Sequence, residues 1–136
     1  MRYAICYVST VNPALSETEI QKALEFSKNW NNDNGITGIL LYSEGNFFQV
    51  LEGGEQLLKD LFCRIKADER HNNIIPIFQK QIPGTKFETY EADFISLDDR
   101  YKDEHFDIYF AHISLLDPSI QSSVKYILNN FTEGIN

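Results

Sequence analysis

The chain has 136 residues, the size of one ordinary domain, and 43% of them are hydrophobic, so it can bury a substantial core. A formal net charge of −8 without any long basic run argues against nucleic acid and anionic membranes as partners. No apolar stretch approaches the roughly 20 residues of a membrane span, and the polar start is no signal peptide, so we expect a soluble cytoplasmic protein.

The first predicted strand covers residues 3–9, "YAICYVS", and places Tyr3, Ile5 and Tyr7 on one face. The two cysteines, Cys6 in this strand and Cys63, fit neither a disulfide framework nor a metal site. Each has apolar neighbours in the sequence, so both are predicted to be small buried residues.

A helix follows, and its start is marked by a capping box of Ser16 and Glu19. Gly35, in "NDNG", is the expected left-handed stop. One face of this helix changes from apolar to polar along its length. That face carries Ile20, Ala23, Leu24, Ser27 and Asn31.

The next two segments, "ITGILLYS" and "NFFQVLE", are predicted to form a hairpin with a tight turn at Glu44 and Gly45. Gln49 is out of place in the second strand, because alternation puts it on the same face as Phe47 and Leu51. A buried amide without partners costs about 1–3 kcal/mol, so this strand must face a hydrogen-bonding partner.

A second helix is predicted from about Gln56 to Arg70, and strands are predicted near 74–82 and 87–96. The resulting βαββαββ order favours a ferredoxin-like α+β fold with both helices on one face of the sheet. The core side of the second helix is formed by Leu57, Leu58, Leu61, Phe62 and Ile65, and Arg64, Asp68 and His71 continue its stripe.

The rest of the chain is predicted to cover the opposite face of the sheet with helices. Asp117 is the expected cap of the last helix, with Pro118 in its first turn. We therefore interpret residues 1–97 as the core and 98–136 as a helical cap of the same domain. The helical spacing rests on Phe106, Tyr109, Phe110 and Ile113, and then on Ile120, Val124, Ile127 and Phe131.

Several polar residues interrupt these apolar faces, and each has an ordinary explanation when taken alone. Tyr7 fits a core tyrosine, and Asn31 fits a helix end. Arg64 and Asp68 are spaced as a surface ion pair, and His71 suits a helix C-terminus. Together with Ser27 and Gln49, they also fit a polar slot for a flat heteroaromatic ligand whose edge is read by amides.

The segments "CYVS", "NWNNDNGITGILLYSEGNFFQVLEG" and "RIKADERH" resemble the BLUF family of blue-light sensors that use FAD. The resemblance covers roughly residues 1–96 and implies that FAD lies between the two helices. FMN and riboflavin stay open, because recognition of the ring does not reach the adenine. The cofactor-binding residues implied are Tyr7, Leu24, Ser27, Asn31, Asn32, Phe47, Gln49, Arg64, Ile65, Asp68 and His71.

In this family the chemistry is photochemical rather than enzymatic, so the resemblance implies that the chain is not an enzyme. Tyr7 matches the photoactive tyrosine, and Gln49 matches the glutamine between that tyrosine and the flavin. Light then leaves the Gln49 amide rotated or tautomerised, which strengthens a hydrogen bond to the flavin carbonyl and shifts its absorption to the red.

Two positions depart from the family pattern. Tyr90 and Ala92 stand where relatives commonly carry tryptophan and methionine, so the signal and the lit-state lifetime are predicted to be altered. Trp30, the single tryptophan, either covers the helix flank or acts as a stacking partner or competing electron donor.

No output domain is expected in a chain of this length, so the signal should pass to a partner protein or through self-association. One alternative is an interaction module that keeps the flavin slot and has lost light signalling. An acylphosphatase-like hydrolase is disfavoured, because the turn "VNPALSET" lacks the arginine and glycines of an anion-binding loop.

Overall fold

The computed structural model describes residues 2–83, 94–98, 109 and 111–133, with the backbone alone for 94–98 and 131–133. Its elements are β1 (Arg2–Val11), α1 (Glu17–Asp33), β2 (Thr37–Ser43), β3 (Asn46–Gly54), α2 (Glu55–Ala67), β4 (His71–Ile82), β5 (Phe94–Asp98) and α4 (Pro118–Glu133).

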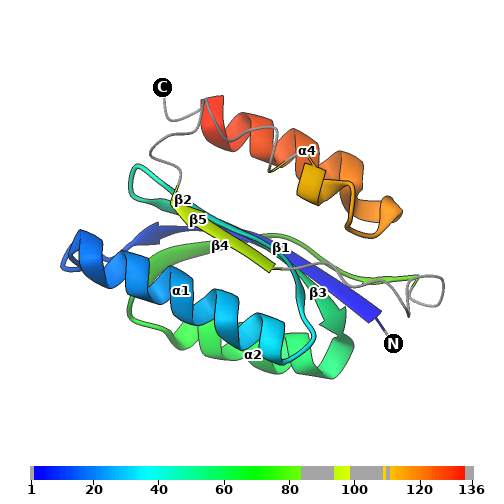
Figure 1. Cartoon of the computed structure of the whole chain (residues 1–136), viewed down its shortest axis with the longest axis horizontal. Coiled ribbons are helices and arrows are strands. Elements are labelled where there is room, and N and C mark those ends of the chain that lie inside the picture. Colours follow the sequence, from blue (N-terminus) through cyan, green and yellow to red (C-terminus); the bar gives the residue numbers. More distant parts are fainter. Residues whose placement is uncertain (1, 84–93, 99–108, 110, 134–136) are drawn as a thin grey trace.

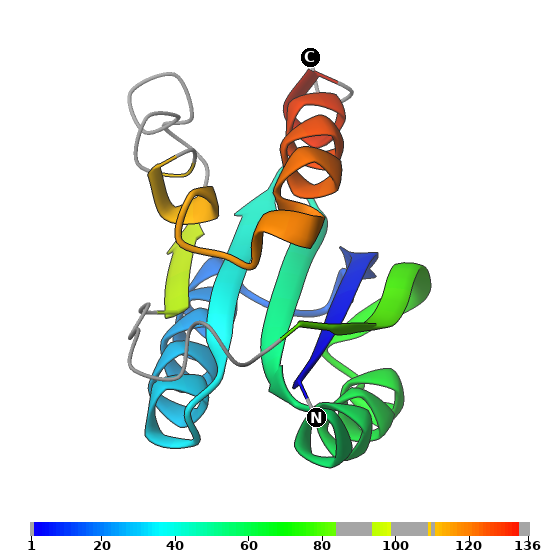
Figure 2. The ribbon, with the colours of Figure 1, turned by 90° about the vertical axis from the view of Figure 1, so that its right-hand side faces the viewer.

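One five-stranded sheet has the order β4-β1-β3-β2-β5, with antiparallel neighbours except for β5, which pairs parallel to β2. Helices α1 and α2 lie on one face of the sheet, and α4 lies on the other (Figure 1). Seen along the helices, α1 lies below the β2–β5 side and α2 below the β1 side (Figure 2). This arrangement confirms the predicted ferredoxin-like α+β fold.

Local signals in the sequence account for the boundaries of α1 and of the hairpin. The capping box is present, since Ser16 Oγ accepts from the Glu19 N–H and Glu19 Oε1 accepts from the Ser16 N–H, both at 3.1 Å. Gly35 has the predicted positive φ of 69°. Glu44 (φ 46°) and Gly45 (φ 88°) form the predicted tight turn, whose twist suits a two-residue hairpin.

The second helix ends earlier than predicted, at Ala67 instead of Arg70. Asp68 takes an extended backbone conformation, and its Oδ1 accepts a hydrogen bond from the Arg70 N–H at 2.9 Å. This side-chain turn redirects the chain, so β4 begins at His71, before the predicted residue 74. The last predicted strand, 87–96, overlaps β5 only at its end, and residues 84–93 lie outside the described part.

Two hydrophobic clusters lie on the two faces of the sheet. Alternation along β1 puts Ile5 and Tyr7 in the cluster below α1 and α2, and Ala4 and Cys6 in the cluster below α4. Cys6 is buried as predicted, whereas the prediction for Cys63 is wrong. Cys63 is exposed because it follows Phe62, and consecutive residues of a helix point in different directions.

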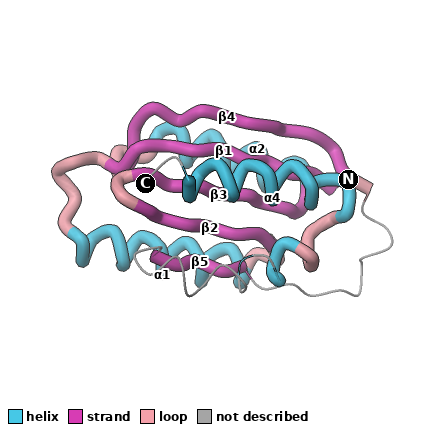
Figure 3. Tube along the Cα trace, turned by 90° about the horizontal axis from the view of Figure 1, so that it is seen from above, coloured by secondary structure: helices cyan, strands magenta, loops and turns pink. Residues whose placement is uncertain are grey.

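The buried stripe of α4 also differs in part from the prediction. Ile120 and Val124 are buried as expected, but the next turn buries Leu128 and leaves Ile127 half-buried, since the stripe advances by four residues. Among the described residues, no helix is long and apolar enough to cross a membrane. Viewed from above, α4 lies over the central strands of the sheet and runs roughly along their direction (Figure 3).

A buried carboxylate ties the start of α4 to the central strand β3. Glu52 is 2% exposed, and its Oε2 accepts from the Asp117 N–H at 2.6 Å. Its Oε1 accepts from Thr37 Oγ1 at 3.1 Å and lies 3.6 Å from Nη2 of Arg2. Burial raises the pKa of the Glu52 carboxyl, and these hydrogen bonds only partly oppose the effect.

Glu52→Gln should therefore change how stability depends on pH. The folded state favours the protonated carboxyl, so this group's contribution to wild-type stability is lost as pH rises through the raised pKa. We expect the free energy of unfolding of the variant, relative to wild type, to increase from about pH 4 to about pH 8. Each unit of pKa difference corresponds to about 1.4 kcal/mol, within reach of urea titrations. An unchanging difference would contradict this account.

Candidate functional site

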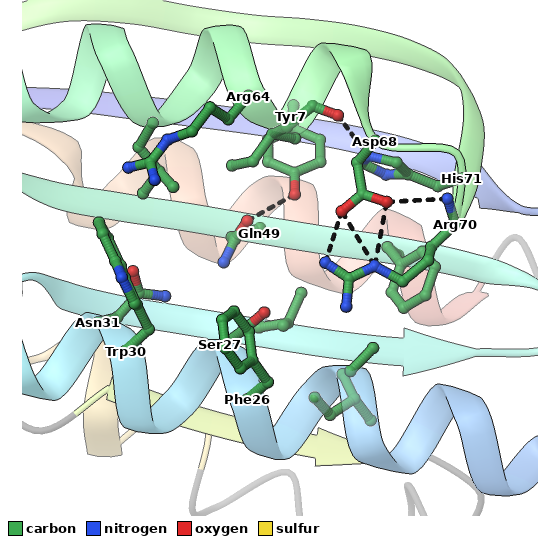
Figure 4. Close-up of a pocket in the computed structure, with 16 residues that line it drawn as sticks. Tyr7, Phe26, Ser27, Trp30, Asn31, Gln49, Arg64, Asp68, Arg70 and His71 are labelled. Atoms are coloured by element: carbon green, nitrogen blue, oxygen red, sulfur yellow. Dashed lines mark hydrogen bonds and ion pairs between the residues drawn. The ribbon is translucent and has the colours of Figure 1, made fainter.

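A cavity of about 250 Å³ lies between α1, α2 and the sheet face that carries Gln49 (Figure 4). One water molecule needs roughly 15 Å³, so the space is large enough for a ligand. Trp30 and ten of the eleven predicted cofactor-binding residues line the cavity. The ten are Tyr7, Leu24, Ser27, Asn31, Phe47, Gln49, Arg64, Ile65, Asp68 and His71.

The cavity wall contains a hydrogen-bonded pair from adjacent strands. Tyr7 of β1 is the direct cross-strand neighbour of Gln49 of β3, so both side chains point to the same face. Tyr7 Oη donates to Gln49 Oε1 at 2.5 Å, and each residue is 3% exposed. Burial raises the pKa of the Tyr7 phenol, and the charge of Asp68 adds to this, so the phenol stays protonated and donates.

The orientation of the Gln49 amide follows from this bond. Its oxygen faces Tyr7, and its nitrogen lies on the opposite side, toward α1 (Figure 4). The amide thus presents a donor to the cavity and an acceptor to the phenol. The Tyr7 ring is fixed by Phe62, with centroids 5.5 Å apart, and by His71 at 6.1 Å.

Asn31 contributes a buried acceptor near the end of α1. Its backbone carbonyl accepts from the Ile36 N–H at 2.9 Å and from the Asn34 N–H at 3.2 Å, which closes the helix end. The side chain is 3% exposed, and its Oδ1 has no hydrogen-bond partner. A buried acceptor left unpaired costs about 1–3 kcal/mol, so the site fits a ligand that brings an N–H.

The other end of the cavity carries an ion pair that the sequence analysis did not anticipate. Arg70 binds Asp68 through its Nε, 3.0 Å from both carboxylate oxygens, and through Nη2, 2.5 Å from Oδ2. Partial burial would raise the pKa of Asp68, but the hydrogen bonds and charge of Arg70 outweigh it and lower the pKa. The Arg64–Asp68 ion pair that the spacing would allow, which was the ordinary alternative for these two residues, is not formed. Arg64 lies over the Trp30 ring instead.

His71, which lines the cavity, connects three elements of the fold. Its Nε2 lies 2.8 Å from the Ile65 carbonyl, which can only accept, so Nε2 carries the proton. Its Nδ1, 2.8 Å from Ser9 Oγ, then accepts from that hydroxyl. Ser9 was not predicted, although it follows Tyr7 by two residues in β1 and so shares its face.

Not every predicted residue meets the cavity. Asn32 is exposed and is not part of the lining, because it points away from its neighbour Asn31 on the helix, and its binding role stays a prediction. Tyr90 and Ala92 lie outside the described residues. The lining residues that were not predicted are Ala23, Phe26, Leu40, Leu61 and Arg70.

Three of these omissions had a signal in the sequence. Ala23 and Leu61 belong to the helical stripes of α1 and α2, and Leu40 is the cross-strand neighbour of Gln49 on β2 once the hairpin register is known. Phe26 had none, since it is 60% exposed at the rim. Arg70 was assigned to a helix turn that does not form.

Comparison with known proteins identifies the family of this chain. Residues 3–93 match the family described as "Sensors of blue-light using FAD". The chain is 30% identical over 87 residues to the blue light- and temperature-regulated antirepressor BluF of Escherichia coli K12, covering 64% of this chain and 22% of that protein. It is 31% identical over 102 residues to the photoactivated adenylate cyclase subunit alpha of Euglena gracilis, covering 75% and 9%.

Solved structures show the same fold. BlsA in its photo-activated state is 26% identical with a TM-score of 0.64, and the match covers 96% of this chain and 94% of that one. Klebsiella pneumoniae BlrP1 with FMN and cyclic diGMP is 26% identical with a TM-score of 0.74, covering 98% and 35%.

The two curated relatives are much longer than this chain, which spans less than a quarter of either. The family match, in contrast, covers most of the chain. It spans the elements from β1 through β4 and includes every residue that lines the cavity. The chain belongs to the BLUF family of flavin-binding blue-light sensor modules.

Proposed function

We propose that this chain is a blue-light photoreceptor that holds FAD between α1 and α2 and signals through Tyr7 and Gln49. The observation that carries the proposal is the buried hydrogen bond from Tyr7 Oη to Gln49 Oε1 in the wall of a ligand-sized cavity. The two ends of the Gln49 amide then have different partners. Its oxygen accepts from the Tyr7 phenol, and its nitrogen can donate to a ligand.

The residues of the cavity fit a flavin ring in chemistry and in shape. Leu24 and Ile65 supply apolar surface from opposite helices, which suits the two faces of a flat ring. The unpaired Oδ1 of Asn31 suits the N–H on the edge of the ring. The Asp68–Arg70 pair makes the other end polar, which suits the ribityl and phosphate side. FAD rests on the family description, and the ring contacts alone would also suit FMN or riboflavin.

When bound, the flavin would absorb blue light and become a strong oxidant. Tyr7 would supply an electron and a proton to the flavin from its buried, protonated phenol and then take both back. During this exchange the Gln49 amide would rotate or tautomerise and so change the hydrogen bonds that it makes to the phenol and to the flavin. A stronger hydrogen bond to the flavin carbonyl in the new arrangement would lower the excitation energy and shift absorption to the red.

The chemistry in this proposal ends with the side chains in a new arrangement and without a released product, so we propose a sensor and not an enzyme. The signal would leave through β3 and the helical cap of residues 98–136 to a partner protein or a second copy. Two relatives have names that couple light to an effector, an antirepressor and an adenylate cyclase, which supports an output of this kind.

A second candidate is a flavin-binding interaction module whose light response is degenerate. It is favoured by Tyr90 and Ala92, which stand where relatives commonly carry tryptophan and methionine. The purified protein separates the two candidates: a yellow protein whose flavin band stays in place under blue light would support the module.

Tyr7→Phe and Gln49→Leu should each retain bound flavin and lose the light-induced red shift. The first removes the hydroxyl that donates to Gln49, and the second removes the amide that must turn over. Absorption spectra in the dark and after blue light measure the shift. Tyr126→Phe, the same change at a position of α4 that is 72% exposed, is the matched control and should keep it. Full photoconversion in either site variant would refute the assigned roles.

Asn31→Ala should weaken FAD binding without destabilising the flavin-free protein. The substitution deletes the ligand's proposed acceptor, at a cost of about 1–3 kcal/mol, which raises the Kd roughly 5- to 150-fold. It also removes a buried, unpaired oxygen, so flavin-free stability in urea should stay equal or rise. Asn29→Ala on the exposed side of α1 is the control for both titrations. Unchanged affinity in Asn31→Ala would exclude this contact.

A further inference from the structure

Arg64 and Trp30 face each other at one end of the cavity. Arg64 comes from α2 and Trp30 from α1, and the guanidinium carbon lies 4.9 Å from the centre of the indole ring. This is within the range of a cation–π contact. Both side chains line the cavity and lie at the end opposite to Asp68 and Arg70 (Figure 4).

The two arginines of the cavity differ in their charge balance. Arg70 is neutralised by the carboxylate of Asp68. Arg64 makes no ion pair with any residue that the structure describes, and its guanidinium lies over the ring of Trp30. Arg64 is exposed, so solvent screens its charge in part, but no carboxylate balances this charge beside the indole.

Trp30 is a potential source of loss in the photochemistry proposed above. Its indole, like the phenol of Tyr7, is among the side chains most easily oxidised by one electron. If one electron passes from Trp30 to the excited flavin, the indole becomes a radical cation and the flavin is reduced by one electron. The electron then returns to the indole and the excitation is spent. Gln49 receives its hydrogen bond from Tyr7. Electron transfer from Trp30 leaves this phenol unchanged, so it gives no driving force for the Gln49 amide to rotate or tautomerise.

We propose that the Arg64 guanidinium suppresses electron donation from Trp30 and so reserves the excited flavin for Tyr7. Oxidation of the indole would place a second positive charge beside the guanidinium, and the two charges repel at this distance. It would also abolish the attraction between the cation and the ring's negative face. Arg64 is thus a positioning residue for the productive electron path. This inference rests on the proposed photoreceptor function.

The test compares quantum yields of the red shift, per bound flavin, in wild type, Arg64→Met, Trp30→Phe and the double variant. Arg64→Met keeps side-chain length without charge, and we expect its yield to fall by roughly twofold or more. Trp30→Phe alone should match wild type, since its donor is already suppressed. The double variant should regain the wild-type yield because the competing donor is gone. Transient absorption should show a tryptophan radical in Arg64→Met only.

Lys66→Met is the matched control. It removes a cation from the same helix, but Lys66 Nζ lies over Phe62, 5.0 Å from the ring centre, and not over Trp30. The yield of this variant should equal that of wild type. Arg64→Lys, which restores the charge, should recover most of the yield lost in Arg64→Met.

A second readout needs no flavin. Trp30 is the single tryptophan, so fluorescence of the flavin-free chain reports its surroundings alone. Iodide, an anion, should quench it more strongly relative to neutral acrylamide when Arg64 is present, and this ratio should fall by roughly half in Arg64→Met but not in Lys66→Met.

The outcomes separate this inference from the proposed function. A wild-type protein that shows no red shift under blue light would refute the proposed photoreceptor function itself. With a photoactive wild type, three results would overturn the role of Arg64 alone: an unchanged yield in Arg64→Met, a low yield that persists in the double variant, or a yield in Trp30→Phe well above wild type. The yield of Trp30→Phe tests the inference even if Arg64→Met fails to bind flavin.

Discussion

The hydrogen bond between Tyr7 and Gln49 sets the requirements that the surrounding structure meets. A carboxamide has a donor and an acceptor, and burial makes both expensive to leave unpaired. The register between β1 and β3 supplies the phenol for one side. The other side opens into the cavity, so the pairing of Gln49 is completed only by a ligand. A hydrocarbon side chain at this position would fill the sheet equally well and would have nothing to switch.

Strand β3 separates this bond from the opposite face of the sheet. Gln49 faces the cavity, whereas its neighbours Phe48 and Val50 pack toward α4. Three residues further on, Glu52 holds the N-terminus of α4 through the Asp117 N–H. β3 lies between two closely packed hydrophobic clusters. A displacement of this strand would therefore shift side chains in both clusters. This geometry makes α4 a physically reasonable recipient of a signal, and coupling itself has to be measured.

Much of this architecture could be predicted from local patterns. The capping box at Ser16, the hairpin turn at Gly45 and the anomaly of Gln49 are written in a few adjacent residues, because capping, turn geometry and strand alternation are short-range effects. The polar residues that the two helices contribute to the cavity were visible as interruptions of two helical stripes. The roles of Gln49 and Tyr7 came from the family resemblance and not from the spacing.

The departures from the sequence-based predictions have different origins, of which two are local and one depends on tertiary contacts. The helical spacing predicted that the second helix continues through Asp68. In the structure, the Asp68 carboxylate binds Arg70 and the helix ends before Asp68. Local pattern also could not decide that Arg64 would choose an indole over a carboxylate four residues away, since this depends on how α1 and α2 are placed. Cys63 has apolar neighbours in sequence yet lies on the outer face of its helix.

The cavity also shows where stability and function are in conflict. Asn31 keeps an unpaired oxygen in a buried position. This arrangement does not favour the flavin-free fold, and it becomes favourable only when a ligand with an N–H lies between the helices. A ligand that binds only the folded chain stabilises it by mass action, which offsets this local cost. The polar residues of this cavity are therefore best understood as parts of a binding site and not as parts of a core.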